Sequence, residues 1–127
     1  MTAKEFLSFY RAAEEKILSN RRQMLLTERR AWEVCSRSYF EYSGEYEDKL
    51  WEENEQLAET MAEIEKAVEK LPDGNGKQVL RLRYIQGKKW SAISEEMCYS
   101  EQHLHRIHQK ALSQIWVPLK YRKKTPE

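Results

Sequence analysis

The polar residues that could carry chemistry in this 127-residue chain gather near its C-terminus. His103, His105 and His108 are close together, and the last two are three apart, a spacing that places them on one face of a helix. No nearby Cys, Asp or second histidine pair completes a ligand set, so we expect no metal site. The sequence also lacks a Gly-rich phosphate loop, a nucleophile elbow and paired catalytic carboxylates. We therefore expect neither enzymatic activity nor a cofactor.

Charge is distributed unevenly along the chain, although its net charge is only +1. Residues 1–76 contain 11 Lys/Arg and 17 Asp/Glu, whereas residues 77–127 contain 11 Lys/Arg and 4 Asp/Glu. The two parts therefore carry net charges of −6 and +7. An acidic part followed by a basic part favours two roles, with contact to a polyanion assigned to the second.

Composition favours an all-helical protein of the cytoplasm. Only four Gly and three Pro occur, and 34% of the residues are charged. No apolar run is long enough for a membrane span, and the N-terminus lacks the features of a signal peptide. Cys35 and Cys98 have no paired spacing, which argues against a disulfide framework or a zinc site. Both thiols are expected to be reduced.

Two long amphipathic helices are predicted over residues 1–71. Thr2 and Glu5 have the spacing of a capping box, and apolar residues then recur at threes, fours and sevens to about Phe40. A break is expected at residues 41–44, around Gly44. The two helices could form an antiparallel hairpin, pair with a second copy, or do both; we expect a homodimer. The second helix has a heptad seam that we assign to oligomerisation: Leu50, Asn54, Leu57, Met61, Ile64 and Val68.

Shorter helices are predicted after residues 72–76, whose Pro, Gly, Asp and Asn residues mark a boundary. A helix over residues 77–85 ends at Gly87, and a second covers residues 90–97. Ser100 is a good N-cap for a third. The last two helices and the tight turn between them have the pattern of a helix-turn-helix. The expected organisation is a hairpin at 1–71, a linker at 72–76, a helix-turn-helix domain at 77–117 and a basic tail at 118–127.

The C-terminal helices closely resemble region 4 of bacterial sigma-70-type factors. The stretches that carry the resemblance are Leu80–Gly87, Trp90–Met97, Tyr99–Ser100 and His105–Leu112. Together with the N-terminal helical pair, they make the chain similar to short phage and prophage regulators of the ArpU and RinA types. The resemblance implies an all-α fold and a sequence-specific transcriptional regulator that binds double-stranded DNA in the nucleoid of a bacterial cell. RNA polymerase is a further candidate partner.

The resemblance also implies which side chains contact DNA. The base-reading positions are Glu101, Gln102, His103, His105 and Arg106. Their chemistry suits base edges, because Gln pairs with adenine, Arg with guanine, and Glu accepts from cytosine. Arg81 and Arg83 could instead form salt bridges with the acidic hairpin. The expected phosphate contacts are Lys77, Arg81, Arg83, Lys110, and Lys120 and Arg122 in the basic run 120–124.

Two residues depart from the sigma-like pattern. Cys98 stands where the turn usually has glycine, so a positive φ there would be strained. Lys89 stands at the N-cap of the first motif helix, where Ser or Thr is common. A DNA phosphate at this helix end would offset the poor cap, which makes Lys88 and Lys89 candidate phosphate contacts. The alternative is a frayed helix start.

Two other functions fit the same pattern. A phage DNA-packaging recognition subunit of the small-terminase kind also joins a helix-turn-helix to an oligomerisation helix; a large ring would indicate packaging, and a dimer regulation. A protein-docking module on RNA polymerase would instead use the acidic residues 45–69.

Overall fold

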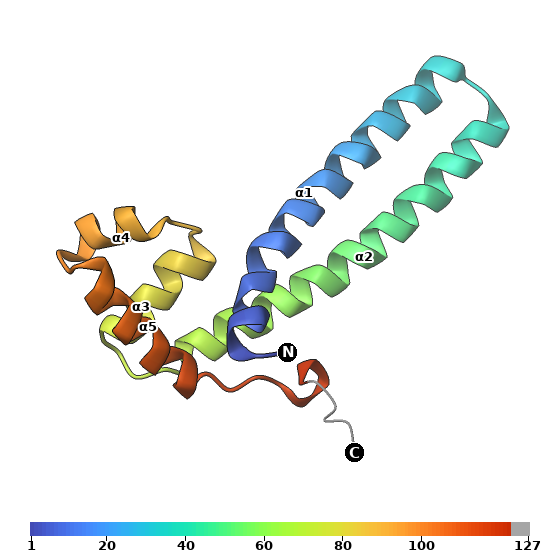
Figure 1. Ribbon diagram of the computed structural model, residues 1–127. Coiled ribbons are helices and arrows are strands. Elements are labelled where there is room, and N and C mark those ends of the chain that lie inside the picture. The colour runs from blue at the N-terminus through green and yellow to red at the C-terminus, as the bar shows by residue number, and fades with distance from the viewer. Residues whose placement is uncertain (123–127) are drawn as a thin grey trace. The chain divides into compact units, whose positions relative to one another are not determined.

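The computed structural model describes residues 1–122, and all regular secondary structure in this range is helical (Figure 1). The prediction of an all-α protein is confirmed. Within this range, no helix is both long and apolar enough to cross a membrane. Lys123 and Lys124 of the predicted basic tail lie outside the described residues. The elements are α1 (Ala3–Val34), α2 (Arg37–Glu69), α3 (Asn75–Leu80), a π-helical turn (Arg81–Ile85), α4 (Trp90–Met97), α5 (Glu101–Gln114) and a 3₁₀ turn (Leu119–Tyr121).

Helix α1 begins as predicted but ends earlier than expected. The Thr2 hydroxyl accepts a hydrogen bond from the backbone N–H of Glu5 at 3.2 Å, which caps the helix. The helix ends at Val34 because Cys35 adopts a left-handed conformation with φ 51°. The predicted break at residues 41–44 is wrong. Gly44 lies inside α2, where a Cβ would meet open space, so the glycine is tolerated although it weakens the helix.

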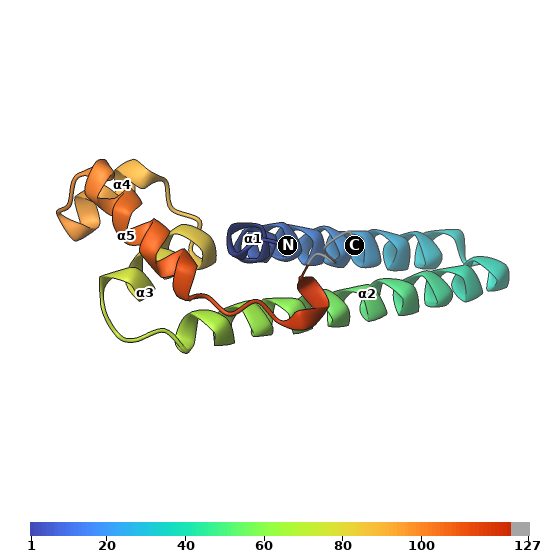
Figure 2. The ribbon, with the colours of Figure 1, turned by 60° about the horizontal axis from the view of Figure 1, so that its bottom comes forward.

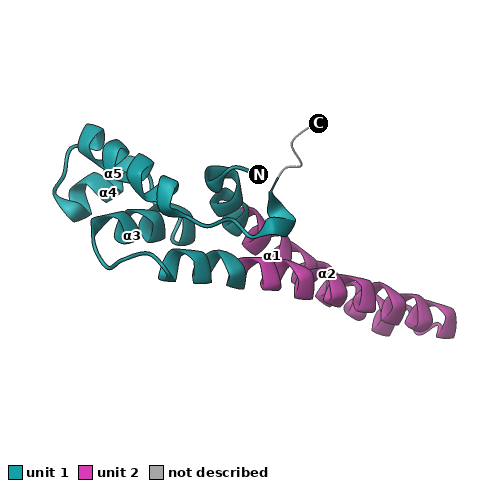
Figure 3. Ribbon diagram, turned by 90° about the horizontal axis from the view of Figure 1, so that it is seen from below, with its two compact units in different colours: residues 1–11, 62–127 teal, residues 12–61 magenta. Residues whose placement is uncertain are grey.

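The chain forms two compact units (Figure 3). One unit contains residues 12–61, and the other joins residues 1–11 to the chain from residue 62 onward. The connection between α2 and α3 is close to the predicted linker at 72–76, but it lies inside the second of these units. The separate roles expected for residues 1–71, 77–117 and 118–127 stay a prediction.

In the unit of residues 12–61, α1 and α2 run side by side in opposite directions (Figures 1 and 2). Leu50 and Asn54 of the heptad seam are buried here, and Asn20 Nδ2 donates a hydrogen bond of 2.8 Å to Asn54 Oδ1. Leu57 and Met61 are half-buried. This corrects the assignment of the seam to oligomerisation, because its residues are packed within the chain. A second copy would have to bind elsewhere.

The other unit has a continuous apolar core. Ile64 and Val68, the last two seam residues, are buried in it, as are Phe6 and Leu7 at the start of α1. The segment after α5 runs beside the end of α2 (Figure 2), and Lys120 Nζ lies 2.6 Å from Glu63 Oε1. The hydrogen bond from Lys120 lowers the pKa of the Glu63 carboxyl.

Residues 75–88 lead into the candidate site through a wide turn. Helix α3 packs closely on α5, where a Cβ at Gly76 would lie 3.2 Å from Ala111 Cβ. In the π turn, the backbone N–H of Gln86 donates to Arg81 O at 2.9 Å, five residues back. Gly87 then ends the helical segment with φ 70°, as predicted.

Candidate nucleic-acid interface

Helices α4 and α5 are held by a small apolar cluster. Ile93 on α4 and Leu104 on α5 are fully buried, and they form one cluster with Val79 and Leu82 from the preceding segments. Around this centre pack four partly buried side chains: Trp90, Met97, Tyr99 and Ile107. The interdigitated cluster fixes how the two helices cross, because a close-packed core has few alternative arrangements.

The turn at residues 98–100 is tight and closed by hydrogen bonds. Cys98 has φ 59° and ψ 37°, the left-handed conformation that made its presence there a predicted source of strain. Ser94 Oγ donates to Tyr99 O at 2.5 Å. Ser100 Oγ accepts from the backbone N–H of His103 at 3.2 Å, which confirms the predicted N-cap of α5.

Replacing Cys98 with glycine is therefore expected to raise the free energy of unfolding by about 0.5–1 kcal/mol. Removal of the Cβ relieves the left-handed strain, partly offset by the greater entropy of glycine in the unfolded chain. Chemical denaturation measures the change. Cys98→Ser is the matched control, since serine keeps the Cβ, and it should change stability little. A glycine variant that is less stable than the serine variant would contradict the strain at this position.

The outward face of α5 is polar and accessible. All five predicted base-reading side chains are exposed, as is Lys110. Neither Arg106 nor Lys110 makes an ion pair within residues 1–122. Aromatic neighbours support two of the histidines: His105 lies 4.6 Å from the Trp90 ring, and His103 lies 4.8 Å edge-on to Tyr99. The exposed residues that form this polar face of α5 are Glu101, Gln102, His103, His105, Arg106 and Lys110.

Lys77 is placed differently from the prediction. Only 8% of this residue is exposed, and its ammonium donates to Glu69 O at 3.0 Å and to Asp73 Oδ1 at 3.1 Å. It thereby satisfies a carbonyl at the end of α2, a site that favours a cation. The assignment of Lys77 to a phosphate contact is corrected, because its charge is already used inside the fold.

Three other basic residues near α4 have partners. Arg81 pairs with Glu69, which is the salt-bridge alternative expected for it. Arg83 donates to Lys88 O at 3.1 Å, and its guanidinium lies 4.9 Å from the Trp90 ring, so it braces the start of α4. Lys88 pairs with Glu96. These cations could contact phosphate only by exchanging their present partners.

Of the remaining phosphate candidates, some have a partner within the fold and others do not. Lys89 stands at the N-cap of α4 with an exposed side chain and no capping hydrogen bond, as the sequence predicted. Lys120 pairs with Glu63, and Arg122 donates to Val117 O at 2.8 Å. Lys89, Arg106 and Lys110 are thus the cations of this region whose side chains form neither an ion pair nor a hydrogen bond in the described part of the chain.

His108 is buried, although it is three residues from the exposed His105. Its ring is only 4% exposed, and a hydrogen bond of 2.7 Å joins its Nε2 to Tyr84 Oη. Burial lowers the pKa of His108 to about 4, with smaller contributions from Lys4, His105 and Arg83. No group of three His, Cys, Asp or Glu that could hold a metal occurs in the described residues.

No family model matches the chain, and searches of curated proteins and of solved structures also found no significant match.

Proposed function

We propose that this protein is a sequence-specific transcriptional regulator that binds duplex DNA and places α5 in the major groove. One observation carries the proposal: a polar, accessible helix face is held on a fully buried apolar cluster behind a tight, capped turn. We infer from it a helix-turn-helix, a motif in which the second helix reads base edges with its N-terminal residues.

The side chains at the start of α5 suit direct reading of bases. Gln102 and Arg106 are four residues apart and so lie on the same face of the helix. Gln pairs bidentately with adenine and Arg with guanine, whereas Glu101 can accept from the amino group of cytosine. Because Arg106 has no ion-pair partner in the described residues, it need not break a contact to bind guanine.

Phosphate contacts would come from lysines of the same two helices. Lys110 is exposed in the C-terminal half of α5. Lys89 is exposed at the start of α4, where the helix dipole favours an anion. The net charge of +7 over residues 77–127 supports contact with a polyanion. Phosphate contacts position the protein, while base contacts supply its specificity.

The transcriptional role rests on the resemblance of residues 71–116 to sigma region 4 and to phage regulators of the ArpU and RinA types. The acidic residues 45–69 are the surface that we propose for RNA polymerase. We propose an auxiliary regulator of phage or prophage origin.

Selection of bound duplexes from a random library, followed by fluorescence anisotropy, tests this proposal. We expect an enriched site that is preferred over random duplex by a factor of about 10³ or more. Arg106→Ala should cost about 1–3 kcal/mol on that site and relax its specificity, because a bidentate base contact is lost. Lys110→Ala should weaken binding to all sequences and reduce the salt dependence by about one phosphate contact.

The matched control is Arg30→Ala, which removes an exposed arginine from α1 and should leave DNA affinity unchanged. Equal effects of Arg106→Ala on the selected site and on random duplex would contradict base reading by α5. If the library yields no enriched site, the regulator proposal fails.

A further inference from the structure

Exposed apolar side chains concentrate in the unit of residues 12–61. Of the ten large hydrophobic residues that are exposed in the described part of the chain, eight lie in this unit. Among them, Leu25 is 66% exposed and Trp51 is 62% exposed. Exposed apolar side chains mark an interaction site where they form a continuous patch.

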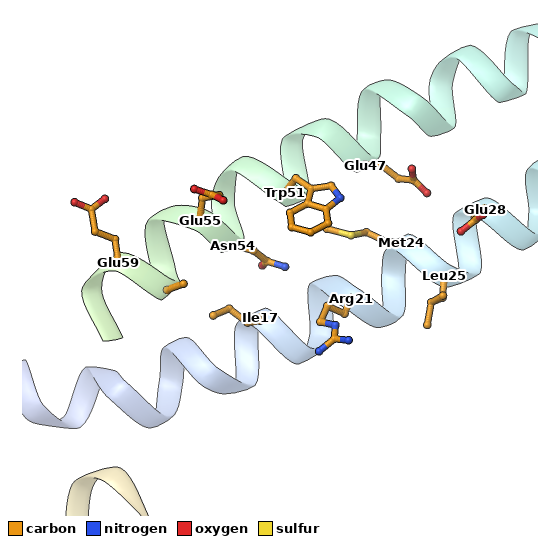
Figure 4. Close-up of a pocket in the computed structure, with 11 residues that line it drawn as sticks. Ile17, Arg21, Met24, Leu25, Glu28, Glu47, Trp51, Asn54, Glu55 and Glu59 are labelled. Atoms are coloured by element: carbon orange, nitrogen blue, oxygen red, sulfur yellow. The ribbon is translucent and has the colours of Figure 1, made fainter. Parts of the chain in front are cut away.

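The two helices form an open groove on this unit (Figure 4). Its volume is about 940 Å³, and Ile17, Met24 and Leu25 line it from α1, opposite Trp51 of α2. Met24 and Trp51 both point into the space between the helices. Asn54 also lines the groove and accepts the hydrogen bond from Asn20. The groove is thus lined by apolar side chains of both helices together with polar and charged ones.

The residues that α1 contributes to this surface have an internal symmetry. Arg21 and Glu28 are equidistant from a point between Met24 and Leu25, and Ile17 and Trp32 are equidistant from the same point. All six lie three, four or seven residues from a neighbour in the set and therefore share one face of the helix. An antiparallel copy of α1 centred on that point would place each arginine beside the partner's glutamate.

We propose that two copies of this chain associate through this face, with α1 packed antiparallel on α1 of the second copy about a two-fold axis near Met24 and Leu25. The axis pairs Met24 with Leu25, Ile17 with Trp32, and Arg21 with Glu28 across the interface. Each interaction occurs twice, as an isologous contact requires. Arg21 and Glu28 are both exposed and form no ion pair within residues 1–122, so they are available for this pairing.

The charges of the two helices favour a second copy as the occupant. Residues 12–34 of α1 contain five Lys/Arg and four Asp/Glu, whereas residues 37–61 contain two Lys/Arg and eight Asp/Glu. Helix α2 brings three glutamates to the edge of the groove. Arg21 lines the same groove, so each copy would bring a positive charge to the acidic surface of the other.

Sedimentation equilibrium without DNA tests the proposal and does not depend on the proposed function. We expect the mass to rise with concentration from the 15.3 kDa of one chain to twice that value. Leu25→Glu should weaken association by at least about tenfold, because it buries a carboxylate from each copy next to the two-fold axis, where the two negative charges repel. Leu119→Glu is the matched control: it alters a leucine that is 75% exposed in the other unit and should leave the mass unchanged.

A charge exchange tests the two-fold axis itself. Arg21→Glu and Glu28→Arg should each weaken association by roughly two- to tenfold, because each turns two attractive pairs into repulsive ones. The double variant restores both pairs in a symmetric dimer and should recover the affinity of the original chain. Circular dichroism should show all variants helical, since the altered side chains are exposed. A constant mass of 15.3 kDa, or a double variant no better than the single ones, would overturn the proposal.

Discussion

Replacing Leu104 with alanine is expected to lower the free energy of unfolding by about 2–5 kcal/mol. Leu104 is 0% exposed and joins α5 to α4 and to the segment that contains Val79 and Leu82. Truncation removes buried apolar surface and leaves a cavity that a close-packed cluster cannot fully collapse. Chemical denaturation followed by circular dichroism gives the change.

Leu119→Ala provides the comparison for this variant, because the same atoms are removed from a leucine that is 75% exposed. Its effect should stay within about 0.5 kcal/mol. Under the proposed function, Leu104→Ala should also reduce DNA affinity, since α5 loses the contact that fixes its orientation. Equal stability changes in the two variants would contradict the position of Leu104 at the centre of the cluster.

Lowering the pH from 6.5 to about 4 is expected to reduce the free energy of unfolding by up to about 3 kcal/mol, at about 1.4 kcal/mol per unit of pKa shift. Burial lowers the pKa of His108 from 6.5 to about 4 in the folded protein. Between these values the unfolded chain binds a proton that the folded chain does not. The contribution of His108 to the free energy of unfolding is therefore fully present above pH 6.5. It falls as the pH is lowered from 6.5 to about 4 and changes no further below that.

The measurement is the free energy of unfolding at several pH values in His108→Gln and in the original chain. The glutamine variant should lose most of the slope above pH 4.5, whatever its stability at neutral pH. Glu63 has a lowered pKa, so its own loss begins only as the pH falls below the ordinary value of 4.5. His103→Gln, which alters an exposed histidine, should keep the slope. Retention of the slope in His108→Gln would refute the assignment.

The sequence predicted those elements whose signals are local. The Thr2 and Ser100 caps and the end at Gly87 depend on side chains within a few residues of the backbone that they satisfy. The heptad seam of α2 followed from periodicity alone. The end of α1 could not be predicted, because cysteine carries no preference for the left-handed conformation found at Cys35, whereas Gly44 offered a stronger but misleading signal.

For the candidate site, the exposed face of α5 could be predicted, but the residues with distant partners could not. Lys77 and His108 look like surface residues in a pattern of polar and apolar positions. Each is buried because another element supplies its hydrogen bonds: Glu69 and Asp73 for Lys77, and Tyr84 for His108. Such pairings become visible only when the helices are placed in space.

The π turn at Arg81–Ile85 limits how this segment can vary in length. The hydrogen bond from Gln86 to Arg81 spans five residues instead of the four of an α-helix. The turn therefore holds one additional residue. If the same residues formed an ordinary α-helix instead, the preceding residues would rotate by about 100° relative to those that follow. Val79 and Tyr84 could then no longer face the cluster and His108 together. Natural insertions should therefore collect in the exposed residues 72–74 and spare this turn.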